Sequence, residues 1–214
     1  MLLSVLMILM LGMGAAQAQE LPAKGTGLAE LIKSMPAKRL KALKATPDGF
    51  LEDAAEIIYA SGKEGQIDAA GLDLFIAAKR AGVRARIMGF FLAADLNNDA
   101  AISETEAALF AGTLQSGRRG KLKWGFDLAD ADADGTMTAG ELRSHAEGVA
   151  MKEFDEVDAA GVRSLILFDL DGNGMVAMDE VVTAVSSLLE QGLGGRVTAR
   201  PARNAAAGKV RVIA

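Results

Sequence analysis

Apolar residues recur at intervals of three and four along most of the chain between residues 48 and 190, and short polar runs separate the periodic segments. This spacing places the apolar side chains on one face of an α-helix, so the sequence predicts an all-α fold. The periodic segments come in pairs, and each pair flanks an acidic loop. The predicted helices are 49–59, 69–81, 83–94, 104–114, 121–129, 139–151, 159–168 and 178–190.

The acidic loops repeat along the chain. They cover residues 60–71, 95–106, 130–141 and 169–180, so their starting points lie 35, 35 and 39 residues apart. A repeat of this length is typical of a supersecondary unit that cannot bury its apolar face alone and must pack against a neighbour. We therefore expect two pairs of helix–loop–helix units, the first within residues 48–116 and the second within residues 117–191.

The loop at residues 169–180 has the oxygen ligands that a calcium ion needs. Ca²⁺ takes six to eight oxygen ligands, and a 12-residue loop supplies them from side chains at positions 1, 3 and 5, a backbone carbonyl at position 7 and a bidentate glutamate at position 12. Gly174 stands at position 6, where the chain turns sharply. The five predicted ligands are Asp169, Asp171, Asn173, Met175 and Glu180.

Two further loops follow the same pattern. In loop 130–141, Gly135 occupies position 6 and the predicted ligands are Asp130, Asp132, Asp134, Thr136 and Glu141. In loop 95–106, Ala100 replaces the glycine, which predicts weaker binding because a side chain at positive φ is strained. The predicted ligands of that loop are Asp95, Asn97, Asp99, Ala101 and Glu106.

The first loop lacks the ligands. Ala60, Gly62 and Gly71 stand at positions 1, 3 and 12 of loop 60–71, so this loop is predicted to brace its neighbour without binding metal. The residues at position 8 are expected to form short bridges, Ile67 with Ile102 and Met137 with Val176. Ser103 with Glu106 and Thr138 with Glu141 have the capping-box spacing at helix starts.

These loops resemble those of the EF-hand superfamily, and the chain is similar to calmodulin-like proteins with four such units. The run from Leu165 to Gly174, with Phe168 directly before the first ligand, resembles the entry into an EF-hand. The resemblance covers about residues 48–190. It implies two pairs of EF-hand units joined by two-residue β bridges, holding two to three Ca²⁺ ions.

The two ends of the chain have a different composition. Residues 1–18 combine an apolar run with Ala16-Gln17-Ala18, which predicts a secretory signal peptide and a periplasmic or extracellular protein. A membrane anchor formed by residues 2–16 is the alternative. Residues 19–47 are interpreted as a basic, solvated lead-in helical segment interrupted at Pro36, and residues 192–214 as a basic, disordered tail.

Nothing in the sequence indicates an enzyme. The chain has no cysteine, and His145 is its only histidine, so it has neither thiol chemistry nor a second histidine for a zinc site. No phosphate-binding glycine motif precedes a helix, and the clustered acids are accounted for as metal ligands. Trp124 is expected to pack in the helix that enters loop 130–141. We expect a monomer whose partners are calcium ions, with no nucleic acid.

The role of calcium stays open at this point. The predicted signal peptide favours an exported protein in which calcium has a structural or buffering role, because the calcium concentration outside the cytoplasm hardly falls. A sensor that opens to bind a target helix is the second possibility, and an interaction module that uses its basic tail on an anionic envelope surface is the third. Loop 130–141, with four carboxylates, is predicted to bind most tightly and loop 95–106 most weakly.

Overall fold

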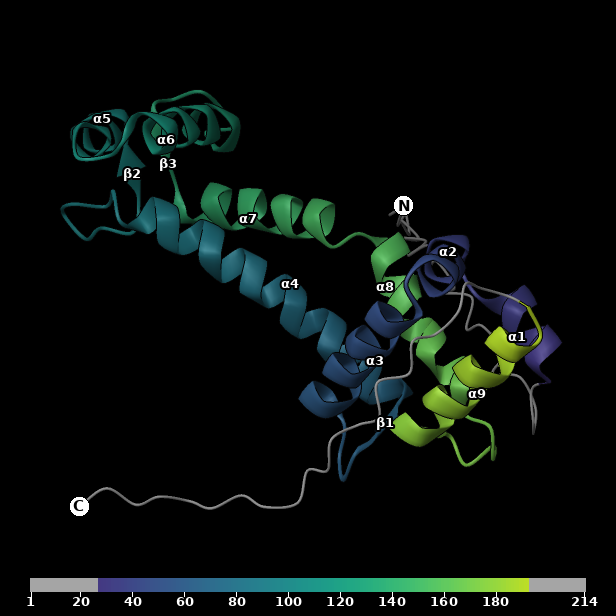
Figure 1. The fold of residues 1–214 in the computed structure, drawn as a ribbon. Helices are drawn as coiled ribbons and strands as arrows, with labels where there is room; N and C mark the ends of the chain where they lie inside the picture. The colour runs from purple at the N-terminus through teal and green to yellow at the C-terminus, as the bar shows by residue number, and fades with distance from the viewer. Residues whose placement is uncertain (1–26, 193–214) are drawn as a thin grey trace, which may run out of the picture.

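The computed structural model describes residues 27–192, so the predicted signal peptide 1–18 and residues 193–214 of the tail lie outside the described residues. Most of the described chain is helical, and two antiparallel sheets of two strands each connect the loops (Figure 1). The helices are α1 (Leu28–Ser34), α2 (Ala37–Ala45), α3 (Pro47–Ser61), α4 (Ala69–Leu92), α5 (Glu104–Gly112), α6 (Ser116–Ala129), α7 (Ala139–Glu153), α8 (Glu156–Arg163), the 3₁₀ helix η1 (Ser164–Phe168) and α9 (Met178–Glu190). The strands are β1 (Gln66–Asp68), β2 (Ile102–Ser103), β3 (Thr136–Met137) and β4 (Met175–Ala177).

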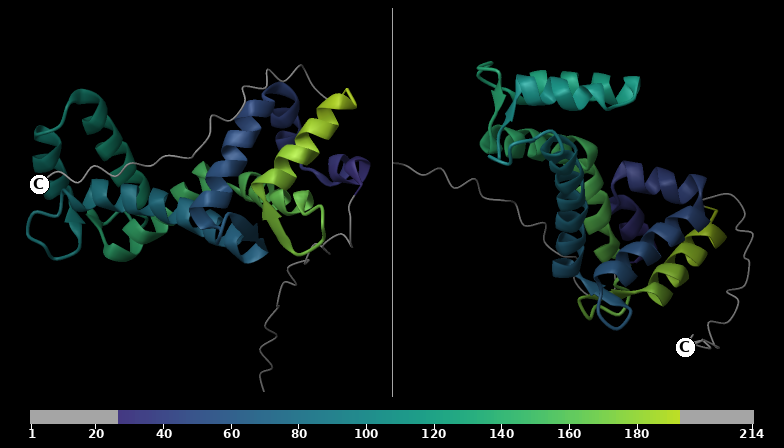
Figure 2. Two further views of the ribbon diagram at one scale, coloured as in Figure 1. Left: turned by 60° about the horizontal axis from the view of Figure 1, so that its bottom comes forward. Right: turned by 90° about the vertical axis from the view of Figure 1, so that its left-hand side faces the viewer.

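The molecule has two lobes joined by a stalk, as Figure 1 and Figure 2 show. The large lobe contains α1, α2, α3, α8, η1 and α9 together with the beginning of α4. The small lobe contains α5 and α6 together with the end of α4 and the beginning of α7. The stalk is the pair of long helices α4 and α7, which lie side by side between the lobes.

Helix α4 is one continuous helix from Ala69 to Leu92, where the sequence predicted two helices separated at Gly82. A single glycine inside a helix costs only about 1 kcal/mol relative to alanine, so it does not by itself end the helix. At about 1.5 Å per residue, a helix of 24 residues holds the loops at its two ends roughly 36 Å apart. Loop 60–71 and loop 95–106 therefore lie in different lobes.

The predicted pairing of the loops is wrong for this reason. Strand β1 pairs with β4, which places Ile67 opposite Val176, and β2 pairs with β3, which places Ile102 opposite Met137. The four residues are the ones expected to form bridges, but their partners are exchanged. The first loop is joined to the fourth and the second to the third, so the pairs are nested.

The large lobe has a core to which both ends of the described chain contribute. Phe50 of α3 lies against Phe168 of η1 with the ring centroids 5.6 Å apart, and the bridge between Ile67 and Val176 is buried in the same cluster. Leu31 and Leu43 of the lead-in segment are 0 % and 1 % exposed there. The interpretation of residues 19–47 as solvated is thus wrong for α1 and α2, whose apolar faces complete this core.

The small lobe has a separate, smaller core around the bridge between Ile102 and Met137. Gly125 of α6 meets Phe91 of α4 so closely that a Cβ at residue 125 would lie 2.6 Å from the Phe91 ring. Trp124, one position away, is 67 % exposed, which contradicts the expected packing. Because this core spans Phe91 to Leu142, it crosses the predicted boundary between the segments 48–116 and 117–191.

Ion pairs join the two helices of the stalk, and little of α4 is buried there. Between residues 77 and 90, no residue of α4 is fully buried. Arg84 bonds to Glu147 at 3.1 Å, and Arg86 pairs with Glu153 of the same partner helix. Exposed ion pairs of this kind contribute little to stability. Within residues 27–192, no helix combines the length and the apolar character needed to cross a membrane.

The nested pairing predicts which buried residues are energetically coupled. Replacing Ile67 by alanine is expected to destabilise the protein by about 2–4 kcal/mol, and replacing Val176 by about 1–3 kcal/mol, because both side chains are fully buried. In a double-mutant cycle followed by urea unfolding, the pair is expected to show a coupling energy of about 0.5–3 kcal/mol. The control cycle between Ile67 and Ile102 is expected to be additive, and coupling there with additivity in the first cycle would contradict the nested arrangement.

Candidate functional site

The three acidic loops place their predicted ligands by the same means. The first ligand of each loop directly follows a helix or its final turn: Asp95 follows α4, Asp130 follows α6 and Asp169 follows η1. The last ligand stands in the first turn of the next helix, which is α5, α7 or α9. The residue at position 8 is buried in its strand, so each loop is anchored at three points.

The carboxylate at position 1 closes each loop by accepting backbone hydrogen bonds. Asp95 accepts from the N–H groups of Asp99 and Ala100 at 3.2 and 3.0 Å. Asp130 accepts from Asp134 and Gly135 at 3.2 and 3.0 Å. Asp169 likewise accepts from Asn173 and Gly174, at 3.1 and 2.8 Å, and also from Gly172. The turn is therefore the same in all three loops, although Ala100 replaces glycine in one of them.

The side chains at positions 3 and 5 each turn back onto the loop in the same way. The oxygen at position 3 accepts a hydrogen bond from the backbone N–H at position 5, and the oxygen at position 5 accepts from the N–H at position 7. Within loop 130–141 these distances are 3.3 Å for Asp132 and 2.7 Å for Asp134. The three side-chain oxygens are consequently held on the inside of each turn.

The glutamate at position 12 joins the two ends of each loop. One oxygen of Glu141 accepts from the N–H and the hydroxyl of Thr138, both at 2.8 Å, and the other accepts from the N–H of Ala131 at 2.8 Å. Glu106 makes the equivalent bonds to Ser103, Leu96 and Asn97. The predicted capping boxes at Ser103 and Thr138 are confirmed.

These hydrogen bonds favour the charged form of the two glutamates. The backbone N–H and then the hydroxyl of Ser103 lower the pKa of Glu106, and the same two groups of Thr138 lower the pKa of Glu141, with Ala131 adding to the effect. Glu180 accepts the corresponding bonds from the N–H groups of Ala177 and Leu170, both at 2.9 Å. Each loop thus holds a carboxylate at its closing position.

Two loops bring three acidic oxygens together. Asp130, Asp132 and Asp134 each have a carboxylate oxygen within 4.8 Å of the other two. Asp169, Asp171 and Glu180 form a second group under the same limit. Loops 95–106 and 169–180 each have an amide in place of one acid, and this amide donates to a carboxylate of the loop, Asn97 to Asp99 at 2.9 Å and Asn173 to Asp171 at 3.0 Å. Oxygen donors this close repel one another as anions, and a cation of high charge is the group that would stabilise them.

Loop 60–71 has another structure. Lys63 and Gln66 exchange backbone hydrogen bonds of 2.8 and 3.0 Å, with Glu64 and Gly65 at positive φ between them, which makes a tight two-residue hairpin turn. A Cβ at Gly62 would lie 2.3 Å from the carbonyl oxygens of Ile58 and Gln66, and a Cβ at Gly71 would lie 2.7 Å from Ile67. Side chains are thus excluded at positions 3 and 12, where the other loops carry two of their five predicted ligands.

The backbone has a feature that the sequence analysis missed. Position 4 of each acidic loop also lies at positive φ, and it is occupied by Asn98, Ala133 and Gly172. Ala100 at position 6 has a φ of +66°, so its strain is present as expected. Asparagine and glycine at position 4 favour this conformation and were a usable signal, whereas Ala133 gave none.

His145 packs beside the small lobe's core and is not grouped with the acidic oxygens. Its ring meets Phe91 edge to face, with the centroids 5.7 Å apart. Burial lowers the pKa of His145, which favours the neutral ring.

Comparisons with protein-family models, with curated proteins and with solved structures found no match to this chain.

The strain at Ala100 predicts the effect of two opposite substitutions. Ala100→Gly is expected to stabilise the metal-free protein by about 0.5–1 kcal/mol, because glycine adopts positive φ without strain. Gly135→Ala is expected to destabilise it by about 1 kcal/mol for the same reason. Ala108→Gly, in the exposed part of α5, serves as the control and is expected to lose about 1 kcal/mol through helix propensity. Urea unfolding with a chelator present measures all three, and destabilisation by Ala100→Gly would contradict the interpretation.

Proposed function

We propose that the protein is an EF-hand protein that binds calcium ions through loops 130–141 and 169–180, with loop 95–106 as a weaker third site. The observation that carries this proposal is the pair of three-oxygen groups, Asp130 with Asp132 and Asp134, and Asp169 with Asp171 and Glu180. Hard oxygen donors at this density, without nitrogen or sulfur, are the donor set that Ca²⁺ prefers.

The arrangement of the loops supports calcium over a smaller ion. Each site would take side-chain oxygens from positions 1, 3 and 5, a backbone carbonyl from Ala101, Thr136 or Met175, and both oxygens of the glutamate at position 12. Magnesium demands near-ideal octahedral geometry and usually keeps several waters, whereas a flexible 12-residue loop with a bidentate carboxylate suits the larger ion. The glutamates are held by capping hydrogen bonds, and they would exchange part of these for the metal.

We infer that calcium binding has a structural or buffering role in an exported protein. The net charge is −5, and the basic residues after residue 191 leave the remainder of the chain more acidic still. A ligand that binds only the folded state raises stability by mass action, and filling acidic loops also relieves repulsion. The proposal of export depends on residues 1–18, and the protein is taken to act by binding and not by catalysis.

A titration of residues 19–214 with calcium tests the proposal. Calorimetry is expected to find two or three sites, near 10⁻⁴ M if the protein is an exported, calcium-stabilised one. Glu141→Gln and Glu180→Gln are each expected to remove one site, because the amide cannot give a bidentate carboxylate. Glu147→Gln, on the same helix as Glu141 but outside the loop, is the matched control and is expected to change nothing. Absence of any binding by the unaltered protein would overturn the proposal.

The nested pairing makes this titration more specific. Loops 95–106 and 130–141 share the β2–β3 bridge, whereas loop 169–180 is bridged to the loop without ligands. Glu141→Gln should therefore also weaken binding at loop 95–106, and it should leave loop 169–180 unaffected. If Glu141→Gln weakened calcium binding at loop 169–180 and left loop 95–106 unaffected, loop 130–141 would be coupled to loop 169–180, which contradicts the nested pairing.

One observation favours a calcium sensor as a second candidate. Leu109, Trp124 and Leu128 of the small lobe are all more than half exposed, although they are apolar. A sensor exposes such residues to a target helix when calcium binds.

Fluorescence of the exposed Trp124 distinguishes a structural role of calcium from a sensor function. Trp124 is the only tryptophan of the chain, so its fluorescence reports on the small lobe alone. For a structural role, we expect calcium to raise the melting temperature while Trp124 emission and the binding of an apolar dye stay nearly constant. A calcium-dependent increase in dye binding, together with a shift in Trp124 emission that Glu141→Gln abolishes, would favour the sensor.

A further inference from the structure

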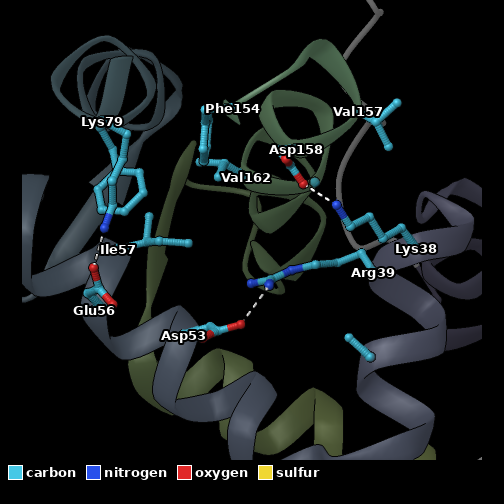
Figure 3. Close-up of a pocket in the computed structure, with 13 residues that line it drawn as sticks. Lys38, Arg39, Asp53, Glu56, Ile57, Lys79, Phe154, Val157, Asp158 and Val162 are labelled. Atoms are coloured by element: carbon cyan, nitrogen blue, oxygen red, sulfur yellow. Dashed lines mark hydrogen bonds and ion pairs between the residues drawn. The ribbon is translucent and has the colours of Figure 1, made fainter. Parts of the chain in front are cut away.

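The large lobe contains a cleft that has no part in the acidic loops. It has a volume of about 310 Å³ and lies between α2, α3, α4 and α8, close to Phe154 (Figure 3). Its walls are mainly apolar. The apolar lining residues are Ala42, Ile57, Phe75, Phe154, Val157 and Val162. A concave, largely apolar space with a few polar groups is the usual form of a small-molecule site.

Three ion pairs surround the cleft, and each joins two different helices. Lys38 pairs with Asp158, Arg39 bonds to Asp53 at 3.3 Å, and Lys79 bonds to Glu56 at 2.6 Å. Figure 3 shows the three pairs around the same space. The charges of the six side chains cancel, so the cleft has no excess charge for a multivalent ion.

Arg39 is the exception among these groups, because it is buried and only partly satisfied. Its side chain is 13 % exposed, and its guanidinium carbon lies 4.4 Å from the centre of the Phe50 ring. Only Nη1 has a hydrogen-bond partner within residues 27–192, whereas Nε and Nη2 are buried without one. Burial lowers the pKa of Arg39, with Asp53 opposing the effect, yet a guanidinium stays protonated in proteins.

The two unpaired atoms belong to the same edge of the guanidinium. Nε–H and one N–H of Nη2 point in parallel, and this edge matches the two oxygens of a carboxylate. Buried donors without an acceptor are rare and costly in folded proteins, so an acceptor is expected at this edge. Asp53 does not supply it, because its carboxylate meets Nη1 and is itself largely exposed.

We propose that this cleft binds a small organic acid with an apolar body, whose carboxylate is held side-on by Nε and Nη2 of Arg39 and whose body lies among Ile57, Phe75 and Val162. Because the charges of the three ion pairs cancel, the cleft has no excess positive charge for a phosphate dianion, and its apolar walls disfavour a fully polar acid. The proposal is independent of calcium, since no residue of the cleft belongs to an acidic loop.

Entry of the acid requires a displacement of the groups that cover this edge of Arg39. Nε and Nη2 are closed to solvent, and Lys38 of α2 pairs with Asp158 of α8 beside Arg39 (Figure 3). The lysine side chain of this pair is 67 % accessible and that of Asp158 is 28 % accessible, so the pair is partly solvated and contributes little to stability.

Phenylacetate and its neutral isostere phenylacetamide test the proposal. In a titration of the full chain with a chelator present, followed by NMR, we expect phenylacetate to shift the Arg39 Nε–H resonance saturably. Phenylacetamide is expected to bind at least about tenfold more weakly, since it lacks the charge-assisted pair. Equal binding of the two compounds would show an apolar cavity only and would overturn the proposal. So would a lack of saturable binding, which would mean that water satisfies Arg39.

Replacing Arg39 by lysine distinguishes side-on recognition of the carboxylate from simple charge attraction. Arg39→Lys keeps the positive charge but loses the side-on edge, so phenylacetate affinity is expected to fall about tenfold. Arg84→Lys, in an ion pair on the stalk, is the matched control and should leave affinity unchanged. Unchanged affinity in Arg39→Lys would overturn the assignment. If that variant fails to fold, the shift of the Arg39 resonance in the unaltered chain still decides the question.

Discussion

The unbroken helix α4 is the constraint on which the rest of the structure depends. It serves as the helix after loop 60–71 and as the helix before loop 95–106, and as a rigid rod it separates them by roughly 36 Å. Neither loop can then reach the other, and each needs a partner supplied by a later part of the chain. The two lobes, the nested strands and the long stalk all follow from this one element.

The separation also divides the acidic loops unequally. The small lobe combines loops 95–106 and 130–141, both of which carry predicted ligands, while the large lobe combines loop 169–180 with a hairpin that excludes side chains at Gly62 and Gly71. The hairpin gains close packing around Ile67 in place of ligands. In the large lobe, loop 169–180 has the clustered acidic residues and loop 60–71 packs closely against it. The apolar faces of the lead-in helices cover their common core.

Features of the fold that depend on residues close together in the sequence were predictable. Helix starts followed from capping residues such as Ser103 and Thr138, and the positions of the four bridge residues followed from the loop register. The choice of partners was not predictable, because it depended on whether Gly82 ends a helix, and a single glycine changes the free energy of a helix by only about 1 kcal/mol. Burial of Leu31 and exposure of Trp124 were missed for a similar reason, since each depends on which helix lies opposite.

The geometry of the acidic loops was more predictable than the fold. The spacing of the acidic residues within 12 residues fixes the loop geometry, and the hydrogen bonds of Asp95, Asp130 and Asp169 repeat it three times. The cleft at Arg39 was beyond sequence reasoning, because its walls come from four helices and its open hydrogen-bonding edge depends on where Asp53 happens to lie.

The nested strands have a consequence for the order in which the chain folds. The small lobe is built from one continuous stretch, so its core can assemble as soon as that stretch is available. Ile67, in contrast, can pack only after Val176 is available, roughly a hundred residues later in the chain, and closing so long a loop is slow. Until then α1 and α3 expose the apolar faces that α9 finally covers. The large lobe is thus the late-folding part of the molecule and the part most exposed to aggregation during synthesis.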